Sequence, residues 1–193
     1  MTYNLKNVFY LGDTHTYAAS TYASAGIEGN IPIDISAYVD PIAKGRSRGQ
    51  GLAVYKVHCQ VAGDGTGNIL SNTDAGSAVI GLTVKPYASS GDNSSALETG
   101  DLTPASDLLI WGAYMTAPAT AVPGNAIGSN AMPFLTPSED VPYVCVRDTI
   151  FQCLETTTGL STNDDWYVSY RMECAMITLD TATLNQLLRT QTA

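Results

Sequence analysis

The chain has 193 residues, enough for one sizeable domain and short for two at about 150 residues per domain. Apolar residues make up 45% of it, which excludes a disordered chain, and the net charge of −9 argues against a dedicated nucleic-acid-binding domain. Only 14% of the residues are charged, against about 25% in a typical soluble domain, while serine and threonine together number 37. A surface of hydroxyls in place of charges suits a protein that packs against copies of itself.

Residues 1–30 are polar and rich in small side chains, with one apolar run at residues 8–11 that predicts a short strand. A charged stretch followed by an apolar run, the pattern of a signal peptide, is not visible here. Tyr3, Tyr10 and Tyr17 recur every seven residues. We therefore expect an extended N-terminal arm whose tyrosines contact the domain or a neighbouring subunit.

From residue 31 onward the apolar residues alternate with a period of two. This pattern predicts strands near 31–37, 52–61, 78–85, 107–115, 143–154 and 166–178, with one or two short strands in addition. In the strand at 52–61 we expect an inward row of Ala53, Tyr55, Val57, Cys59 and Val61. The clearest alternation is in the last strand, whose inward row is Trp166, Val168, Tyr170, Met172, Cys174 and Met176.

Asp180 is a candidate N-cap for a short C-terminal helix with an apolar stripe of Leu184, Leu187 and Leu188. Residues 88–105 and 116–142 read as long loops, the second with five prolines. Long connections between strands favour a Greek-key or jelly-roll sandwich over an up-and-down barrel. The predicted fold is therefore all-β: an N-terminal arm (1–30), a single jelly-roll-like β-sandwich of about eight strands (31–180) and a short helix or tail (181–193).

The four cysteines are predicted to be free thiols. Cys59, Cys145, Cys153 and Cys174 form no CxxC pair, and two of them lie on apolar strand faces, where a thiol behaves as a small hydrophobe. Without a visible signal peptide, buried thiols are favoured over disulfides. This predicts a chain made and folded in a reducing cytoplasm, with Cys59 and Cys174 slow to react.

Catalytic and metal-binding patterns are not found. The two histidines, His15 and His58, have no nucleophile motif beside them, and no cysteine or histidine spacing fits zinc or iron. Two oxygen-rich segments, 64–68 and 163–165, leave a weak calcium alternative open. The sequence therefore predicts a protein that is not an enzyme and has no cofactor and no metal site.

Three of the nine basic residues lie close together, one directly before and two within the glycine-rich segment Gly45-Arg-Ser-Arg-Gly-Gln-Gly51. Lys44, Arg46 and Arg48 are the candidates for contact with a nucleic-acid backbone, although a glycine-rich connection with solvated charges is favoured. A strand follows this segment where a phosphate-binding motif would need a helix. Contact with nucleic acid is therefore expected to be weak or absent.

The stretch from Asp34 to His58 and the closing stretch from Trp166 to Gln191 resemble the opening and end of single-jelly-roll capsid proteins of viruses. The resemblance lies in organisation: a polar N-terminal segment, eight-strand spacing, long loops, and a long last strand that runs into a short tail. It implies a major capsid protein that self-assembles into a viral shell, located in the virion and assembled in the host cytoplasm. Its partners would be copies of itself, with room for other virion proteins.

Two other functions remain open at this point. A carbohydrate- or receptor-binding sandwich of the fibre or spike type would have the same strands and would use loop aromatics such as Tyr87, Trp111 or Trp166. A small β-fold enzyme would need a polar cluster around His15 or His58. The strand pattern by itself does not separate these three functions.

Overall fold

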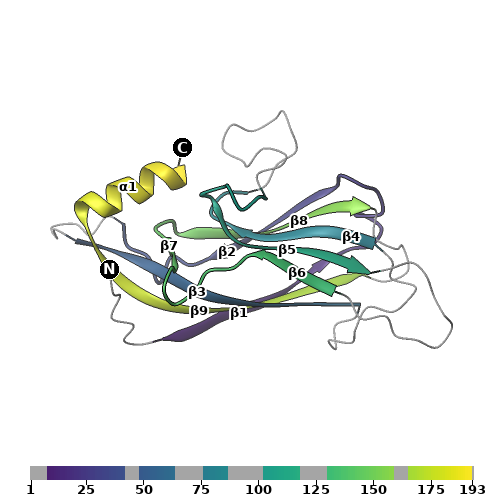
Figure 1. Cartoon of the computed structure of the whole chain (residues 1–193), viewed down its shortest axis with the longest axis horizontal. Coiled ribbons are helices and arrows are strands. Elements are labelled where there is room, and N and C mark those ends of the chain that lie inside the picture. The colour runs from purple at the N-terminus through teal and green to yellow at the C-terminus, as the bar shows by residue number, and fades with distance from the viewer. Residues whose placement is uncertain are drawn as a thin grey trace.

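The computed structural model describes residues 8–41, 48–63, 76–86, 102–117, 130–158 and 165–192. These residues form nine strands and one helix (Figure 1). In chain order they are β1 (Phe9–Tyr17), β2 (Glu28–Asp34), β3 (Arg48–Ala62), β4 (Gly76–Thr83), β5 (Leu109–Ala117), β6 (Asn130–Leu135), β7 (Tyr143–Cys145), β8 (Thr149–Thr158), β9 (Trp166–Asp180) and α1 (Thr181–Thr192).

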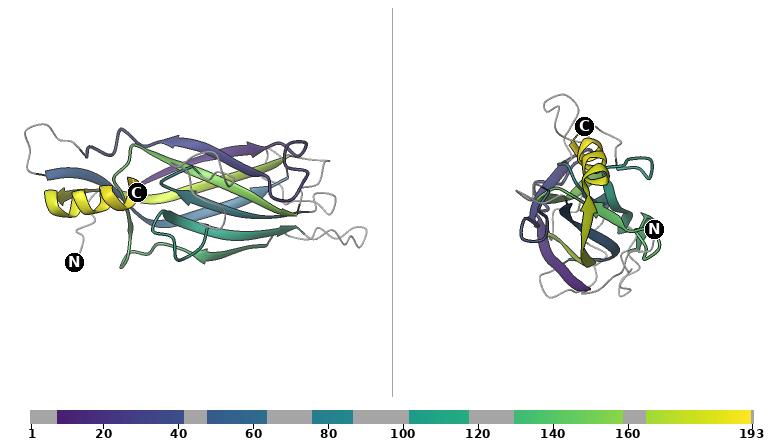
Figure 2. Two further views of the ribbon diagram at one scale, coloured as in Figure 1. Left: turned by 90° about the horizontal axis from the view of Figure 1, so that it is seen from above. Right: turned by 90° about the vertical axis from the view of Figure 1, so that its left-hand side faces the viewer.

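The strands form two antiparallel sheets packed face to face, with α1 at one end (Figures 1 and 2). Sheet A has the order β1-β9-β3-β7, and sheet B has the order β2-β8-β4-β5-β6. Sheet A thus has four strands, and sheet B has four strands plus β6 at its edge. The chain passes from one sheet to the other at almost every connection. This double Greek key is a jelly roll, so the predicted fold class is confirmed.

The core lies between the sheets and is centred on β9. Its expected inward row is buried from Trp166 to Cys174, with exposed fractions of 0–5%. The prediction fails only at Met176, which is 46% exposed. Beyond Cys174 the strand continues past the main core, where Ile177 and Leu179 pack under α1.

Strand β3 contains a bulge that changes which residues face inward. The register against β9 shifts between Val54 and Lys56, so that Val54 pairs with Cys174 and Lys56 pairs with Glu173. A bulge adds one residue and reverses the alternation beyond it. Beyond the bulge, the expected inward residues Val57 and Val61 do lie in the main core. Before the bulge, the main core contains Leu52 and Val54, whereas the expected Ala53 packs in the cluster beneath α1.

The N-terminal boundary at residue 30 is wrong for part of the expected arm. Residues 9–17 form β1, which pairs with β9 along its whole length, and β2 already begins at Glu28. Phe9 and Leu11 pack against the main core, and Tyr17 lies within it. Residues 1–7 lie outside the described residues.

Two further strand predictions need correction. The predicted strand at 143–154 is two strands in different sheets, β7 and β8, separated by residues 146–148. Within the expected loop 116–142 the structure contains β6, which pairs with β5. Pro133 had argued against a strand there, but β6 is the last strand of sheet B, where proline is tolerated.

Helix α1 begins as predicted, because Asp180 Oδ1 accepts a hydrogen bond from Thr183 N at 2.8 Å. Leu184 is buried against β3 and β9, and Leu187 and Leu188 pack beside it. At the other end of the helix, Gln191 reaches β7. Its Nε2 donates to Val144 O at 2.6 Å, and its Oε1 accepts from Val146 N at 3.0 Å. No helix in the described part of the chain is long and apolar enough to cross a membrane.

We expect Gln191→Ala to lower the free energy of unfolding by about 1–3 kcal/mol, because it leaves a buried N–H and a carbonyl without partners. Gln191 is 2% exposed. The exposed Gln186→Ala on the same helix is the matched control and should change little. Urea denaturation of the two variants measures the difference, and equal midpoints would show that the Gln191 bridge does not hold the helix in place.

Candidate subunit-contact surfaces

The outer face of sheet A carries a row of side chains from three strands at one level. Tyr10 of β1 pairs with Glu173 of β9, which pairs with Lys56 of β3. The next row joins Gly12, Arg171 and His58 in the same way. Because side chains at facing positions of adjacent strands point to the same side of a sheet, these residues share the outer face.

The polar groups in these rows interact with each other. Arg171 Cζ lies 5.7 Å from the centroid of the Tyr10 ring, within the range of a cation–π contact. His58 Nε2 donates to Glu173 Oε1 at 2.8 Å, since a carboxylate oxygen can only accept. The Tyr10 ring nevertheless remains 60% exposed. Arg171, also exposed, has no carboxylate within ion-pair distance among the described residues.

Around these side chains the face is hollowed into a shallow groove of about 970 Å³ that runs over β1, β9 and β3. Gly12 forms part of its floor, where a Cβ atom would meet the backbone of Tyr170. Thr14 and Ser169 line it further along, with their hydroxyl oxygens 2.8 Å apart. The groove therefore combines the exposed Tyr10 ring, the Arg171 cation without an ion pair, and hydroxyls. Two carboxylates also line it: Glu173, which is bonded to His58, and Asp13.

A tight acidic turn between β6 and β7 lies next to the edge of sheet A that is farthest from β1. Ser138 N donates to Val141 O at 3.2 Å, and Val141 N donates to the Ser138 hydroxyl at 3.1 Å. These two bonds hold Glu139 and Asp140 at the tip, both exposed and without a basic partner in the described structure. Val141 is 74% exposed. A fixed turn thus presents two carboxylates beside an apolar side chain.

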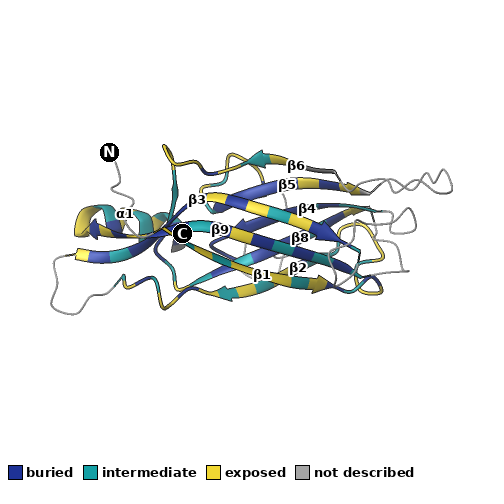
Figure 3. Ribbon diagram, turned by 90° about the horizontal axis from the view of Figure 1, so that it is seen from below, coloured by how far each residue is buried: buried dark blue, intermediate teal, exposed yellow. Residues whose placement is uncertain are grey.

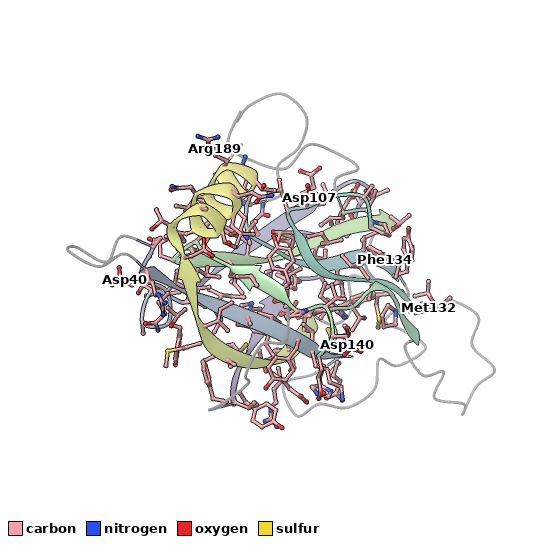
Figure 4. The ribbon with its side chains drawn as sticks, turned by 60° about the vertical axis from the view of Figure 1, so that its left-hand side comes forward. Asp40, Asp107, Met132, Phe134, Asp140 and Arg189 are labelled. Carbon is pink, nitrogen blue, oxygen red and sulfur yellow. The ribbon has the colours of Figure 1, made fainter. Side chains whose placement is uncertain are left out.

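A third surface lies on the outer face of sheet B, near its free edge. Tyr114 is 52% exposed, and its ring centroid lies 4.8 Å from that of Phe134. Phe134 lies over Gly112, whose missing side chain provides the space. Met132, the partner of Tyr114 in the β5–β6 ladder, is 60% exposed. Met132 and Phe134 lie at the periphery of the molecule (Figure 4).

The predicted arm residues separate into three cases. Tyr10 is exposed and available to a neighbour. Tyr17 is 0% exposed, so the prediction that it contacts another subunit is wrong; it fills the core and packs edge-on against Tyr22. Tyr3 lies outside the described residues. A seven-residue spacing places Tyr10 and Tyr17 on opposite faces of a strand, because side chains alternate with a period of two.

The predicted nucleic-acid contact is only partly within the described chain. Arg48 is exposed at the start of β3 and pairs in register with Asp180. The pKa of the Asp180 carboxyl is lowered, first by the hydrogen bonds from Thr183 and to a smaller degree by the Arg48 charge. Lys44 and Arg46 lie outside the described residues, so the role of this segment stays a prediction.

The aromatics named for a carbohydrate-binding loop do not provide one. Trp111 is 3% exposed and Trp166 is 0% exposed, and both belong to the main core. Both were placed correctly on strands, but a buried indole cannot stack on a sugar. Tyr87 lies outside the described residues.

The histidines lie on different faces of sheet A. His15 points inward between the sheets, with Nδ1 2.6 Å from Gln152 Oε1 and Nε2 3.7 Å from Asp13 Oδ2. His58 is on the outer face, bonded to Glu173. Their ring hydrogen bonds in the described chain thus go to the Gln152 amide and to the Glu173 carboxylate, an arrangement that positions the rings. The described residues contain no group of three metal-ligating side chains.

The four cysteines are free thiols, as predicted. Burial raises the pKa of the Cys59 thiol to about 12, and burial together with the Glu173 carboxylate raises that of Cys174 to about 12. Burial also raises the pKa of Cys145. Because the thiolate is the nucleophile, these groups are poorly suited to covalent chemistry.

We expect Cys59 and Cys174 to react with a thiol reagent at pH 8 roughly a thousandfold more slowly in the native protein than in the unfolded chain. The thiolate fraction sets this ratio, given an ordinary cysteine pKa of about 8.5. Colourimetric labelling with and without denaturant measures it. Labelling of either residue within seconds in native protein would contradict the observed burial.

Four residues of these surfaces carry no motif that marks them as site residues in the sequence: Arg171, Glu173, Glu139 and Asp140. The first two alternate with the apolar row of β9 and so were placed on an outer face, but nothing local indicated which strands would lie beside them. The other two lie in a segment read as loop, where the Ser-Glu-Asp-Val sequence between prolines is typical of a turn.

Comparison with known proteins gives similar structures but no related sequence. No family model matches the sequence, and neither does any curated protein. Among solved structures, VP1 of Merkel cell polyomavirus in complex with disialyllactose aligns over 90% of this chain and 95% of its own, with 6% identity and a TM-score of 0.45. VP1 of Trichodysplasia spinulosa-associated polyomavirus with 3′-sialyllactose covers 93% and 99%, with 9% identity and a TM-score of 0.47.

A virus-like particle of Merkel cell polyomavirus also aligns, over 99% of this chain and 80% of its own, with 7% identity and a TM-score of 0.44. Each of these alignments spans most of both chains at low identity. Function is therefore argued from the surfaces of this chain itself.

Proposed function

We propose that this chain is a structural virion protein, a capsid subunit that acts by self-association and not by catalysis. The observation that supports it is the position of the exposed apolar side chains. Edge strands β1 and β2 run along one long side of the sandwich and β6 along the other (Figure 3). Val8 (49% exposed) and Tyr10 belong to the first side, and Met132 and Val141 to the second.

Two different apolar sides favour head-to-tail contacts between copies. A two-fold contact uses one patch twice, whereas contacts between two unlike patches continue from copy to copy and close into a ring or shell. Tyrosine and methionine are enriched at such interfaces and charged residues are depleted. The low charged fraction of 14% agrees with a surface that is largely covered in an assembly.

A virion location follows from this proposal, as does a possible role for the basic segment. If one end of the sandwich faces a genome, Lys44, Arg46 and Arg48 are the residues that would contact it. Of these three, Arg48 pairs in register with Asp180 directly before α1, and Arg147 donates a hydrogen bond to Gln191 O in that helix, which also carries Arg189. With a net charge of −9, such a contact would be weak.

The proposal is tested by light scattering and negative-stain electron microscopy of the purified chain over a range of concentration and salt. We expect rings, shells or fragments of them whose amount rises with concentration. A stable monomer at every concentration and salt would overturn the proposal in favour of a monomeric binding module.

A further inference from the structure

We propose that the acidic turn Ser138–Val141 of one copy docks into the sheet A groove of the next, with Glu139 and Asp140 against Arg171 and Val141 against the Tyr10 ring. This inference rests on the proposed self-association and names the contact that drives it. It begins from charge: the Arg171 guanidinium lies over the exposed Tyr10 ring without an ion pair, and the turn presents two exposed carboxylates without a basic partner among the described residues. Of the two carboxylates in the groove itself, Glu173 is bonded to His58 and Asp13 lies within 3.7 Å of His15, so neither is paired with Arg171.

The two partners lie at the same height along the strands. Tyr143, two residues after the turn, pairs with Val54 of β3. Lys56 lies just beyond the bulge and is in one row with Glu173 and Tyr10. A second copy placed beside the first, with little shift along the strands, therefore brings its β1 row level with the turn. No rotation out of the plane of the sheet is needed.

The turn is also close to sheet A. Burial is the largest cause of the raised pKa of the Tyr55 phenol, and both Glu173 and Glu139 raise it further. Tyr55 lies on β3, the strand that pairs with β7 directly after the turn. A neighbour placed edge to edge with β7 therefore brings its β1 next to the turn.

The turn is distant from the Tyr10 side of the groove in its own chain. In sheet A, β9 and β3 lie between β1 and β7, and neighbouring strands are about 4.8 Å apart. The turn precedes β7, so it is roughly 14 Å from the β1 row of its own sheet. The β1 edge of another copy, beside β7, brings the Tyr10 ring and the Arg171 guanidinium over it next to the turn.

Apolar contact adds to the charge pairing. Val141 and Tyr10 are among the most exposed large apolar side chains of the described residues, at 74% and 60%. Bringing them together removes apolar area from water at both partners. Ser138 holds the turn in one conformation in the free chain, so little conformational entropy is lost on docking.

The experiment uses two charge-reversal variants of the full chain. Arg171→Glu reverses the groove, and Glu139→Arg with Asp140→Arg reverses the turn. Each variant alone should need at least about tenfold more protein to assemble, because like charges then face each other. All three side chains are exposed, so unfolding curves should stay unchanged and separate a docking effect from misfolding.

A mixture of the two variants provides the decisive measurement. In an equimolar mixture, each reversed turn can meet a reversed groove and each native turn a native groove, so assembly should return. The restored particles should contain the two variants in alternation, which native mass spectrometry reads as equal numbers.

Matched controls carry the same charge changes away from the groove. Arg189→Glu lies on α1, and Asp107→Arg lies before β5; both are well separated from Asp140 in Figure 4. These variants should assemble like the unmodified chain. Asp148→Arg can be added to Asp107→Arg to match the two-residue reversal.

The outcomes separate this inference from the proposed function. If the unmodified chain assembles and both reversed variants assemble equally well, or if the mixture stays unassembled, the docking inference is overturned while self-association stands. If the unmodified chain never assembles, both fall.

Discussion

Replacing Tyr17 by alanine is expected to lower the free energy of unfolding by about 3–5 kcal/mol, the range measured for large aromatic residues in cores. Tyr17 is fully buried in the main core at the end of β1, with its hydroxyl 3.4 Å from Gln152 O. Loss of the ring leaves a cavity beside Trp166, the residue of β9 that pairs with Tyr17. Urea denaturation monitored by tryptophan fluorescence measures the change.

Tyr10→Ala is the matched control, because the two tyrosines lie on one strand and face opposite sides. Tyr10 is exposed on the groove, so its loss should leave the unfolding midpoint within about 0.5 kcal/mol and raise the concentration needed for assembly. If both tyrosines instead acted from a free arm, neither substitution would change stability. Equal unfolding midpoints for the two variants would therefore contradict the placement of β1 in sheet A.

Much of the jelly roll could be predicted from the sequence because its central strands are buried on one face and long. In β9 the alternation continues without a break from Trp166 to Cys174, and only a strand places all of these residues on one side. The N-cap of α1 was equally visible, since Asp180 precedes the leucine stripe directly. Both signals are local, and they depend on no partner strand.

The strands that were missed or misread lie at sheet edges or contain an irregularity. In β1 the apolar row stops after Leu11, because Asp13 and His15 face a crevice that opens between β1 and β2. In β6 a proline interrupts the pattern, and in β3 the bulge near Tyr55 reverses it. An edge strand needs fewer apolar residues than a central one, so its period-two signal is weak.

The candidate contact surfaces could not be predicted for a different reason. The groove joins Tyr10, His58 and Arg171, which lie in three strands far apart in the sequence and meet only through the order of sheet A. Composition indicated self-association, but the residues involved depend on register. A shift of one residue in β1 would turn Tyr10 inward and remove the aromatic ring from the groove.

The same dependence on β1 leads to an expected result for truncation. A chain that begins at residue 8 should fold and unfold cooperatively, whereas a chain that begins at residue 18 should lose its cooperative transition. The longer deletion removes Phe9, Leu11 and Tyr17 from the core and leaves one whole edge of β9 without its ladder. It also removes His15, the partner of the buried Gln152 amide.

Circular dichroism during heating and one-dimensional NMR of methyl groups distinguish the two truncated chains. A cooperative transition at the normal midpoint in the chain that begins at residue 18 would show that β1 is dispensable, as expected of an arm. Assembly of the chain that begins at residue 8 then tests the remaining tyrosine of the predicted arm. If that chain assembles normally, Tyr3 is not needed, and the contact between copies rests on Tyr10, which β1 holds in place on the outer face of sheet A.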